Sequence, residues 1–453
     1  MTETANRFMI AGTGSGCGKT TVTCAVLAAL AARGRDTAAF KCGPDYIDPM
    51  FHRKALGIPA HNLDGFFCDG KTIRALIAKY SRETSVIEGV MGFYDGACGS
   101  AHALSQTTET PVVIVIGCGG MSDSIGAVMS GFLNYRRPNN ISGFIFNRLP
   151  AKLIPLAKNL CAELGTEYFG CLPKNGFSFE SRHLGLVTAD ETDDIREKLS
   201  ALGKLAEENI LLDRLTELTA PLPTEKLAVK PLSVDKKPTI AAARDKAFCF
   251  TYAESIDLLE SLGCRIEWFS PLSDKTMPPA DGLILSGGYP ELYAERLSGN
   301  ASMRKSIRSA VLDGMPTIAE CGGFMYLHDK LCDGDRSYNM AGVIKGEVFR
   351  TDRLQRFGYI TMTAENGGLL CGKGGSLKAH EFHYWDSTAC GSAFISEKTD
   401  GTRYNCCHHT ETLYAGFPHI YLCSDIGAAE RFVRKCITYG EKHGQDKKDN
   451  SDG

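Results

Sequence analysis

Gly12-Thr13-Gly14-Ser15-Gly16-Cys17-Gly18-Lys19-Thr20-Thr21 is a glycine-rich stretch between a short apolar run and a long helical pattern. The apolar run covers residues 8–11, and the helical pattern, rich in alanine and leucine, covers residues 22–33. A strand, a glycine loop and a helix in this order form a phosphate site, because backbone N–H groups and the helix N-terminus face one anion. The sequence therefore predicts a P-loop; a plain glycine-rich turn is the alternative.

The spacing within this loop differs from the usual one, in which four residues separate the first glycine from Gly-Lys-Thr. Thr13 holds the position of that first glycine, and Gly12 lies one residue earlier. This longer variant resembles the dethiobiotin-synthetase-like branch of P-loop proteins. We expect Lys19 to reach the β- and γ-phosphates of ATP and the Thr20 hydroxyl to bind Mg²⁺. The expected nucleotide-binding residues are Gly14, Gly16, Gly18, Lys19, Thr20, Thr21 and Lys41.

The length of the chain suggests two domains, and its charge, N-terminus and apolar runs indicate a cytoplasmic protein. The chain has 453 residues, enough for two domains with large cores. Its formal net charge of −3 produces no field that would recruit nucleic acid or an anionic membrane. Residues 1–7 are polar, unlike a signal peptide, and no apolar run is long enough to span a bilayer. The sequence leaves the oligomeric state open, a homodimer included.

The first half of the chain alternates between strand and helix patterns. The expected strands after the first are residues 37–41, 85–88, 111–116 and 141–147, and the helices between them include 72–80 and 122–132. Apolar runs bounded by glycine suit strands that are buried on both faces of a parallel sheet. This alternation predicts a doubly wound α/β domain.

Charged side chains stand where two of these strands end. They are Lys41, Asp45 and Asp48 after the second strand and Glu88 and Asp95 after the third. Ligands of an open α/β sheet bind beyond the carboxyl ends of its strands, so we expect these five side chains to converge on the P-loop.

Carboxylates at this edge are suited to hold Mg²⁺ or its waters. Asp48 and Glu88, together with Thr20, are the expected metal-binding residues. Asp45 and Asp95 are candidates for substrate binding. For each acid the alternative is the capping of a loop by an Asx-type turn.

A proline- and charge-rich segment, residues 220–237, has the composition of a linker. A second α/β alternation follows, with strands at 239–243, 264–269 and 282–285 and helices at 252–262 and 301–313. Residues 440–453 are charged and polar and are expected to be disordered. The predicted boundaries are 1–220 for the nucleotide-binding domain, 221–237 for the linker, 238–439 for the second domain and 440–453 for the tail.

A second candidate site centres on Cys321. Residues 316–327 predict a strand, a sharp turn and a helix, with Cys321 at the turn and two glycines after it. This arrangement is typical of a nucleophile elbow, and a helix N-terminus lowers a thiol pKa. Gly287 and Gly288 end another strand, and their N–H groups are candidates for an oxyanion hole. The alternative for Cys321 is a buried small hydrophobic residue.

Such a cysteine needs a general base. Two stretches offer one: residues 380–384, which contain His380 and His383, and His419 in residues 416–421. The other cysteine-rich feature is Cys406-Cys407-His408-His409. A metal site is one interpretation of this cluster, but adjacent residues rarely bind one ion, which favours a structural or incidental role. The 18 cysteines form no C-x-x-C pair and are expected to be reduced thiols.

Taken together, these motifs resemble the cobyrinate a,c-diamide synthase family, glutamine-dependent amidoligases of corrinoid biosynthesis. The matching stretches, in the family's order, are residues 11–21, 41–49, 88–96, 285–300, 319–327 and 380–384. They cover nearly the whole chain before the tail. The fusion of a P-loop synthetase half to a class I-type glutaminase half is more specific to this family than either motif alone.

The resemblance implies the following chemistry. Glutamine is hydrolysed in the C-terminal half, with Cys321 as nucleophile and His419 as base. Ammonia then reaches the N-terminal half, where ATP phosphorylates an acetate of the macrocycle and ammonia displaces phosphate from the acyl phosphate. The implied substrates are cobyrinate or a related corrinoid, glutamine and ATP, with Mg²⁺.

The sequence departs from the related enzymes near the proposed base. Class I triad glutaminases usually carry a glutamate two residues after the base, where this chain has Tyr421. The diamide-synthase branch also lacks that acid, but it has a second histidine that is absent here.

Three alternatives remain open at this stage. The substrate can also be hydrogenobyrinate or a nickel sirohydrochlorin, because the motifs do not depend on which metal the macrocycle holds. A P-loop regulatory or partitioning ATPase leaves Cys321 without a role, and a stand-alone glutaminase leaves Lys19 without one.

Overall fold

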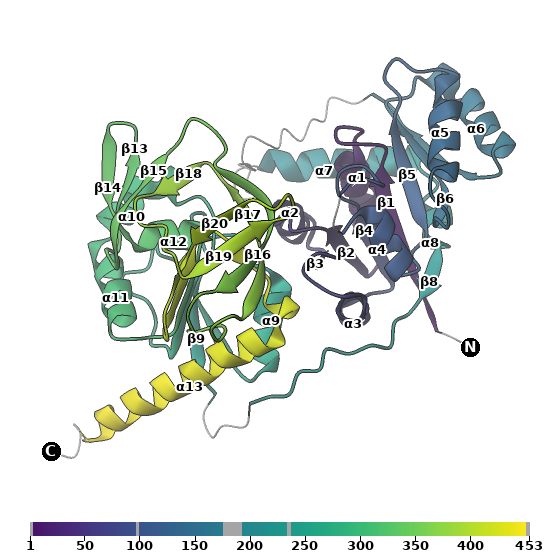
Figure 1. Cartoon of the computed structure of the whole chain (residues 1–453). Coiled ribbons are helices and arrows are strands. Elements are labelled where there is room, and N and C mark those ends of the chain that lie inside the picture. The colour runs from purple at the N-terminus through teal and green to yellow at the C-terminus, as the bar shows by residue number, and fades with distance from the viewer. Residues whose placement is uncertain (1–2, 97–98, 175–192, 233–236, 450–453) are drawn as a thin grey trace. The chain divides into compact units, whose positions relative to one another are not determined.

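The computed structural model describes residues 3–96, 99–174, 193–232 and 237–449 (Figure 1). The chain divides into two compact units, Met1–Leu227 and Ala228–Gly453. This division falls inside residues 221–237, the segment whose composition predicts a linker. The last strand of the first unit, β8 (Thr219–Pro221), pairs antiparallel with β1 (Thr4–Gly12), so ordered pairing in this unit extends to Pro221.

The first unit alternates strands and helices along the chain. Its elements after β1 are α1 (Lys19–Ala32), β2 (Thr37–Cys42), α2 (Ile47–Phe51), the π-helix η1 (His52–Leu56), β3 (Ala60–Leu63), α3 (Gly70–Tyr80), β4 (Thr84–Glu88), α4 (Ala101–Thr107), β5 (Val112–Gly117), α5 (Ser124–Asn134), β6 (Ile141–Asn147), the 3₁₀-helix η2 (Ala151–Leu153), α6 (Ile154–Glu163), β7 (Glu167–Leu172), α7 (Asp193–Asn209) and α8 (Leu212–Thr216).

The sheet of this unit has the strand order β3-β2-β4-β1-β5-β6-β7, and every pairing along this path is parallel. Its central strands are buried apolar runs, as a sheet covered on both faces requires. The order reverses around β1, which is where an open α/β sheet binds its ligand. Lys41 of β2 pairs in register with Glu88 of β4, so both polar residues reach the same edge.

Helix α1 anchors the P-loop to the core of the first unit. Its residues from Val22 to Leu30 are all buried, and it packs against α7 as well as against β1, β2 and β4 (Figure 1). A Cβ on Gly203 of α7 would lie 3.2 Å from Ala28, so this glycine allows the two helices to approach closely. Burial on several sides explains why the sequence of α1 is apolar nearly all round.

The second unit starts with a parallel α/β core and then adds two further sheets (Figure 1). Its elements are β9 (Thr239–Ala243), α9 (Ala253–Ser261), β10 (Arg265–Phe269), β11 (Gly282–Leu285), η3 (Pro290–Tyr293), α10 (Ala294–Gly299), α11 (Ala301–Leu312), β12 (Thr317–Glu320), α12 (Gly322–Leu327), β13 (His328–Asp333), β14 (Arg336–Asn339), β15 (Ile344–Arg350), β16 (Arg356–Ala364), β17 (Ser376–His383), β18 (Trp385–Ser387), β19 (Phe394–Lys398), β20 (Arg403–Cys406), β21 (His408–His409), β22 (Leu413–Gly416), β23 (His419–Ile420), η4 (Leu422–Ser424) and α13 (Ile426–Asp449).

The core sheet of this unit has the order β10-β9-β11-β12-β22-β21, and only β21 is antiparallel to its neighbour. The second sheet has the order β14-β13-β15-β18 and the third β20-β19-β16-β17-β23. Strand β17 shows why these later strands form: its residues alternate between exposed and buried, the period of a sheet with one covered face. Both units are α/β, and the expected alternation is extended by mostly antiparallel sheets after α12.

The tail differs from the expected disorder. Helix α13 continues to Asp449, and His443 Nε2 lies 2.8 Å from Asp313 Oδ2. The beginning of this helix is buried, and lysine, glutamate and glutamine then extend it, since they are good helix formers. The expectation from composition overlooked this continuity. Residues 450–453 lie outside the described part of the chain.

Candidate active site

The P-loop lies between the end of β1 and the first turn of α1. Gly16 has φ +79° and Gly18 has φ +95°, a left-handed backbone that glycine adopts at little cost. A Cβ on Gly18 would lie 1.8 Å from Asn147 Nδ2, so only glycine fits there. Around Gly14 and Gly16 there is open space for a ligand, because no atom lies within 4 Å of an added Cβ. This is a loop with room for phosphate beside a helix N-terminus.

Two residues at the end of β6 brace this loop, and the sequence analysis did not identify them. Asn147 Nδ2 donates a 3.0 Å hydrogen bond to the Cys17 carbonyl, and Arg148 Nη2 donates a 3.1 Å bond to the Gly16 carbonyl. The strand-end rule that led to Lys41 and Glu88 applies equally to the strand at residues 141–147 and would have found them.

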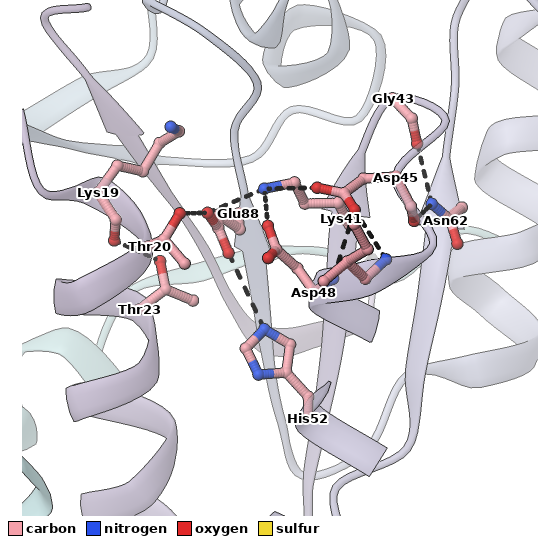
Figure 2. Close-up of polar contacts among 11 residues, drawn as sticks. Lys19, Thr20, Thr23, Lys41, Gly43, Asp45, Asp48, His52, Asn62 and Glu88 are labelled. Atoms are coloured by element: carbon pink, nitrogen blue, oxygen red, sulfur yellow. Dashed lines mark hydrogen bonds and ion pairs between the residues drawn. The ribbon is translucent and has the colours of Figure 1, made fainter. Parts of the chain in front are cut away.

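A cluster of acids and one lysine forms beside the loop, from β2, α2 and β4 (Figure 2). Lys41 Nζ lies 2.5 Å from Asp48 Oδ2, 2.9 Å from Glu88 Oε1 and 3.7 Å from Asp45 Oδ2. The Thr20 hydroxyl, on the first turn of α1, donates a 2.7 Å hydrogen bond to Glu88 Oε1. The structure thus brings Thr20, Lys41, Asp45, Asp48 and Glu88 together.

Burial and charge act against each other on this cluster. Burial disfavours the charge of Lys41, but Asp48, Glu88 and Asp45 outweigh it and raise the pKa of the ammonium well above its usual value. Burial also opposes ionisation of Glu88, yet Lys41, His52 and Lys19 hold the pKa of this carboxyl well below its usual value. Burial and the neighbouring Asp48 raise the pKa of Asp45 to about 7.

The other predicted residues of this unit have distinct positions. Asp45 Oδ1 accepts the N–H groups of Ile47 (2.8 Å) and Asp48 (3.3 Å), so this acid caps α2 besides facing Lys41. Asp95 accepts a 2.9 Å hydrogen bond from the N–H of Gly92, three residues earlier, and so closes its own loop; it is not among the ion-pair partners of Lys41. The Lys19 ammonium forms no ion pair with any described residue, and Figure 2 shows it apart from the Lys41 cluster.

His52 is a buried neighbour of the cluster that the sequence analysis missed. It begins the π-helix η1, and its Nε2 lies 3.9 Å from Glu88 Oε2, longer than a hydrogen bond (Figure 2). Among the described residues, neither Glu88 Oε2 nor His52 Nδ1 has a hydrogen-bond partner. Short π-helical turns inside helices are frequent at functional sites, but no sequence pattern marks them.

This cluster fits a divalent cation. Its donors are carboxylates and a threonine hydroxyl, the oxygen ligands that Mg²⁺ prefers. Mg²⁺ is commonly bound by one or two carboxylates together with waters and substrate phosphates, so Asp48 and Glu88 with Thr20 suffice. The buried and unpartnered Glu88 Oε2 is the kind of atom that a bound cation or its water would satisfy.

In the second unit, Cys321 occupies a strained turn between β12 and α12. Its backbone has φ +45° and ψ −101°, a conformation that non-glycine residues rarely adopt and that is characteristic of nucleophile elbows. The turn is held by a 2.7 Å hydrogen bond from the Cys321 N–H to the Gly416 carbonyl. A Cβ on Gly323 would lie 2.0 Å from the Leu285 carbonyl oxygen, so the helix can pack on β11 only with glycine there.

The glycine loop after β11 lies against this turn. The backbone nitrogen of Gly288 is 3.0 Å from the point where a Cβ on Gly322 would stand. A Cβ on Gly287 would lie 2.3 Å from His419 Cε1, so this glycine makes room for the imidazole ring. Both candidate oxyanion-hole residues therefore border the elbow.

His419 is the histidine that faces Cys321. It is buried on β23, and its Nδ1 lies 3.7 Å from Glu320 Oε2. Burial would lower the pKa of His419, but interaction with Cys321 and with the nearby Glu320 carboxylate raises the pKa to about 10. A histidine with this pKa binds a proton tightly at neutral pH, so it can take the proton of the thiol and, once positive, stabilise the resulting thiolate. Sequence reasoning missed Glu320, which directly precedes the nucleophile.

The rival histidine, His383, has other contacts. Its Nδ1 bonds to the Trp385 carbonyl at 2.7 Å, and its ring stacks on Phe417 with centroids 4.0 Å apart. Its Nε2 lies 3.8 Å from Glu381 Oε1. His380 lies on β17 in register with His419. Interaction with Cys321 is one of the causes of the raised pKa of His419.

Cys406, His408 and His409 each contact a residue outside the Cys406–His409 cluster, and Cys407 Sγ lies 3.4 Å from Cys406 Sγ. Cys406 Sγ lies 2.9 Å from Ser396 Oγ, His408 Nε2 lies 2.8 Å from the Ala389 carbonyl, and His409 Nε2 accepts a 3.1 Å hydrogen bond from the Leu370 N–H. No group of three metal-ligating side chains occurs in the described ranges. The contacts favour the structural interpretation of this cluster.

Across the four described stretches, no helix has both the length and the apolar character required to cross a bilayer.

Comparison with known proteins gives the class of each unit. Residues 8–182 match the CobQ/CobB/MinD/ParA nucleotide binding domain. Residues 239–425 match the CobB/CobQ-like glutamine amidotransferase domain. A P-loop unit joined to a glutamine amidotransferase unit defines a glutamine-dependent amidoligase, a carbon–nitrogen ligase.

Curated relatives match over nearly the full length of the chain. The cobyrinate a,c-diamide synthase of Caldanaerobacter subterraneus subsp. tengcongensis is 36% identical, covering 96% of this chain and 99% of the relative. The same-named proteins of Priestia megaterium (35% identical; 95% and 97%) and Fusobacterium nucleatum subsp. nucleatum (37% identical; 91% and 97%) are similar to it as well. The chain belongs to the cobyrinate a,c-diamide synthase family.

Proposed function

We propose that this chain amidates the a and c acetate side chains of cobyrinate in cobalamin biosynthesis, with glutamine or free ammonia as nitrogen source. ATP activates each carboxylate as an acyl phosphate. The observation that carries this proposal is one chain with two different sites: Lys19 in a P-loop beside an acidic cluster, and Cys321 on an elbow facing His419. The names of the relatives supply the substrate.

We assign glutamine hydrolysis to residues 238–439. His419 accepts the thiol proton, and the Cys321 thiolate attacks the side-chain amide carbon of glutamine. The N–H groups of Gly287 and Gly288 bind the developing oxyanion. His419 then returns its proton to the departing ammonia, and water hydrolyses the thioester to glutamate.

We assign phosphoryl transfer to residues 1–220. The backbone N–H groups from Gly14 to Thr21 bind the phosphates of ATP, and Lys19 neutralises charge on the γ-phosphate as it is transferred. The acceptor carboxylate of the macrocycle attacks this phosphorus, and ADP leaves. Ammonia then attacks the acyl carbon, phosphate leaves, and the amide forms.

Mg²⁺ would be held by Thr20, Asp48 and Glu88, and when bound it neutralises phosphate charge. Lys41 links Asp48 to Glu88 and fixes their positions. Asp45, which faces the same ammonium, is placed to meet the acceptor side of the substrate. Asp95 does not contact Lys41; it would affect substrate binding only by holding the loop that it closes through the Gly92 N–H.

The alternatives differ in what they leave unexplained. A regulatory ATPase does not account for the strained Cys321 or for the raised pKa of His419. A stand-alone glutaminase does not account for the cluster around Lys41. The same amidation of hydrogenobyrinate or a nickel sirohydrochlorin uses every residue named above, and a direct substrate comparison separates these macrocycles.

Phosphate release tests the class of reaction. An amidoligase consumes ATP productively only when both a macrocycle and an ammonia source are present. We expect phosphate release with cobyrinate plus glutamine to exceed release with either one alone by at least about tenfold. Equal release without the macrocycle indicates an ATPase, and equal amidation of all three macrocycles removes cobyrinate as the preferred substrate.

A further inference from the structure

The carboxylate nearest to His419 precedes the nucleophile in the chain. Glu320 is the last residue of β12, and its Oε2 lies 3.7 Å from His419 Nδ1. Its other oxygen, Oε1, accepts a 2.9 Å hydrogen bond from the N–H of Ile420. The side chains of Glu320 and His419 are only 12% and 5% exposed, so solvent screens their interaction weakly. Glu320 thus contacts the base and the backbone beside it.

The elbow explains how neighbouring residues can both serve one histidine. In a regular strand, consecutive side chains point to opposite faces. Cys321 leaves the strand geometry at φ +45°, which turns its side chain out of this alternation. The pKa of His419 responds to both Glu320 and Cys321, as expected if both face the same ring.

The usual position for a triad acid is occupied by a different kind of residue. Two positions after His419 the chain has Tyr421, whose ring packs edge-on against Tyr252 with centroids 4.8 Å apart. A carboxylate therefore does not reach His419 from that side. Glu320 supplies one from the opposite direction in the chain.

We propose that Glu320 is the positioning acid of the glutaminase site: it orients His419 and stabilises the imidazolium during glutamine hydrolysis at Cys321. This inference rests on the proposed glutaminase activity. Glu320 touches neither substrate nor the reacting sulfur, so it acts through the histidine.

The physical role follows from which nitrogen faces which group. Nδ1 faces Glu320, which leaves Nε2 as the nitrogen available to the thiol. When the thiol proton moves to Nε2, the ring becomes positive and the carboxylate stabilises it. The same proton later leaves with ammonia, so no proton has to pass to Glu320. A separation of 3.7 Å is long for a hydrogen bond, and such contacts commonly shorten when substrate binds.

A purely structural role for Glu320 makes a different prediction. The bond from the Ile420 N–H needs only an acceptor oxygen, which glutamine also provides. Glu320→Gln therefore keeps an acceptor for the Ile420 N–H and removes the negative charge. If the acid merely shapes the loop, this variant behaves like the parent enzyme.

The experiment compares Glu320→Gln with Glu381→Gln in the full chain, with ATP, Mg²⁺ and cobyrinate present. Glu381 is a matched control, because its buried carboxylate lies 3.8 Å from a histidine that does not face Cys321. We expect Glu320→Gln to lower kcat for glutamine hydrolysis by at least about 10²-fold, with little change in KM. Glu381→Gln should lose less than about threefold.

The pH profile gives a second readout that a structural role would not move. Glu320 raises the pKa of His419, so removing its charge should let the imidazolium lose its proton at lower pH. Cys321 and Glu320 are ionisable groups that raise the pKa of His419. We therefore expect the basic limb of kcat/KM for glutamine to move to lower pH in Glu320→Gln only.

Each outcome decides the question. Ammonia-dependent amidation bypasses Cys321 and shows whether each variant has folded. If Cys321→Ala abolishes glutamine use while Glu320→Gln keeps both the rate and the pH profile, the inference about Glu320 is wrong and the proposed function stands. If Cys321→Ala still uses glutamine, the proposed function itself fails.

Discussion

Thr20 Oγ1 donates a 2.7 Å hydrogen bond to Glu88 Oε1, which joins the first turn of α1 to the end of β4. The same carboxylate oxygen lies 2.9 Å from Lys41 Nζ. Thr20 and Glu88, which are both expected to bind the metal, are thus hydrogen-bonded to each other. Glu88 therefore contacts both Thr20, a proposed nucleotide- and metal-binding residue, and Lys41.

Lys19 tests the phosphate site. Replacing it with alanine should abolish amidation with glutamine and with ammonia alike, because its charge stabilises the transferred phosphoryl group. Basal glutaminase should persist, since Cys321 lies in the other unit. Amidation assays with both nitrogen sources check this. If the Lys19 variant still amidates the macrocycle, the assignment of Lys19 to the phosphate site is wrong.

Asp48 and Glu88 test the metal site. We expect Asp48→Asn and Glu88→Gln each to lower turnover by more than about tenfold, roughly 1.4 kcal/mol, at saturating Mg²⁺. ATP binding should change less, because the phosphates keep their backbone contacts. The assay uses ammonia, so the glutaminase site cannot interfere. Near-normal turnover in both variants would show that Asp48 and Glu88 do not bind the metal, and would leave a loop-capping role for them.

Lys41 tests the charge balance of the cluster. Lys41→Met leaves three carboxylates without their buried cation, a change that typically costs about 3–5 kcal/mol. Glu88 is ionised because its pKa is depressed, so its pairing contributes stability above the unfolded pKa of a carboxyl and loses it as pH falls through the folded value.

The pH window of Glu88 lies below about pH 5, whereas Asp45 loses its proton near pH 7. Because Asp45 is ionised at about pH 8 and protonated at about pH 5, we expect the stability deficit of Lys41→Met to be larger at about pH 8. Thermal unfolding of the variant at both values measures this, with the exposed Lys71→Met as control. A deficit that grows toward acid would contradict the charge account.

Cys321 tests the separation of the two sites. Cys321→Ala and Cys321→Ser should lose glutamine-dependent turnover and keep activity with ammonia, which bypasses the thioester. Parallel assays with the two nitrogen sources decide this. Equal loss of both activities in a folded variant would contradict a two-site enzyme.

His419 tests the choice of base. His419→Ala should lose about 10²–10⁴-fold with glutamine and little with ammonia. His383→Ala is the matched control, because this ring bonds to the Trp385 carbonyl instead of facing Cys321. The assignment of the base is wrong if the two variants show the reverse pattern.

The sequence predicts best where chemistry and local structure coincide. The P-loop needs glycines and a strand before its helix, and the elbow needs glycines after Cys321, so both turns can be identified from their residues. The strands around Lys41 and Glu88 follow from apolar runs, and the edge of a parallel sheet then brings their ends together.

What the sequence did not predict depends on backbone geometry or long-range packing. Glu320 meets His419 because β23 lies against the end of β12, a contact between residues distant in the chain that no local pattern predicts. His52 stands on a π-helical turn that has no sequence signature. The sheets of the second unit after α12 join strands distant in the chain, such as β17 and β23. Helix α13 continues beyond its buried start into a segment whose composition alone predicts disorder.

The most direct test of the central claim follows labelled nitrogen from glutamine into the macrocycle. Cobyrinate is incubated with the full chain, ATP, Mg²⁺ and glutamine labelled at its amide nitrogen, and the product is analysed by mass spectrometry. Our account predicts a diamide with label at both the a and c positions and with ADP and phosphate formed for each amide. ATP hydrolysis and glutamate formation without a labelled macrocycle would contradict it.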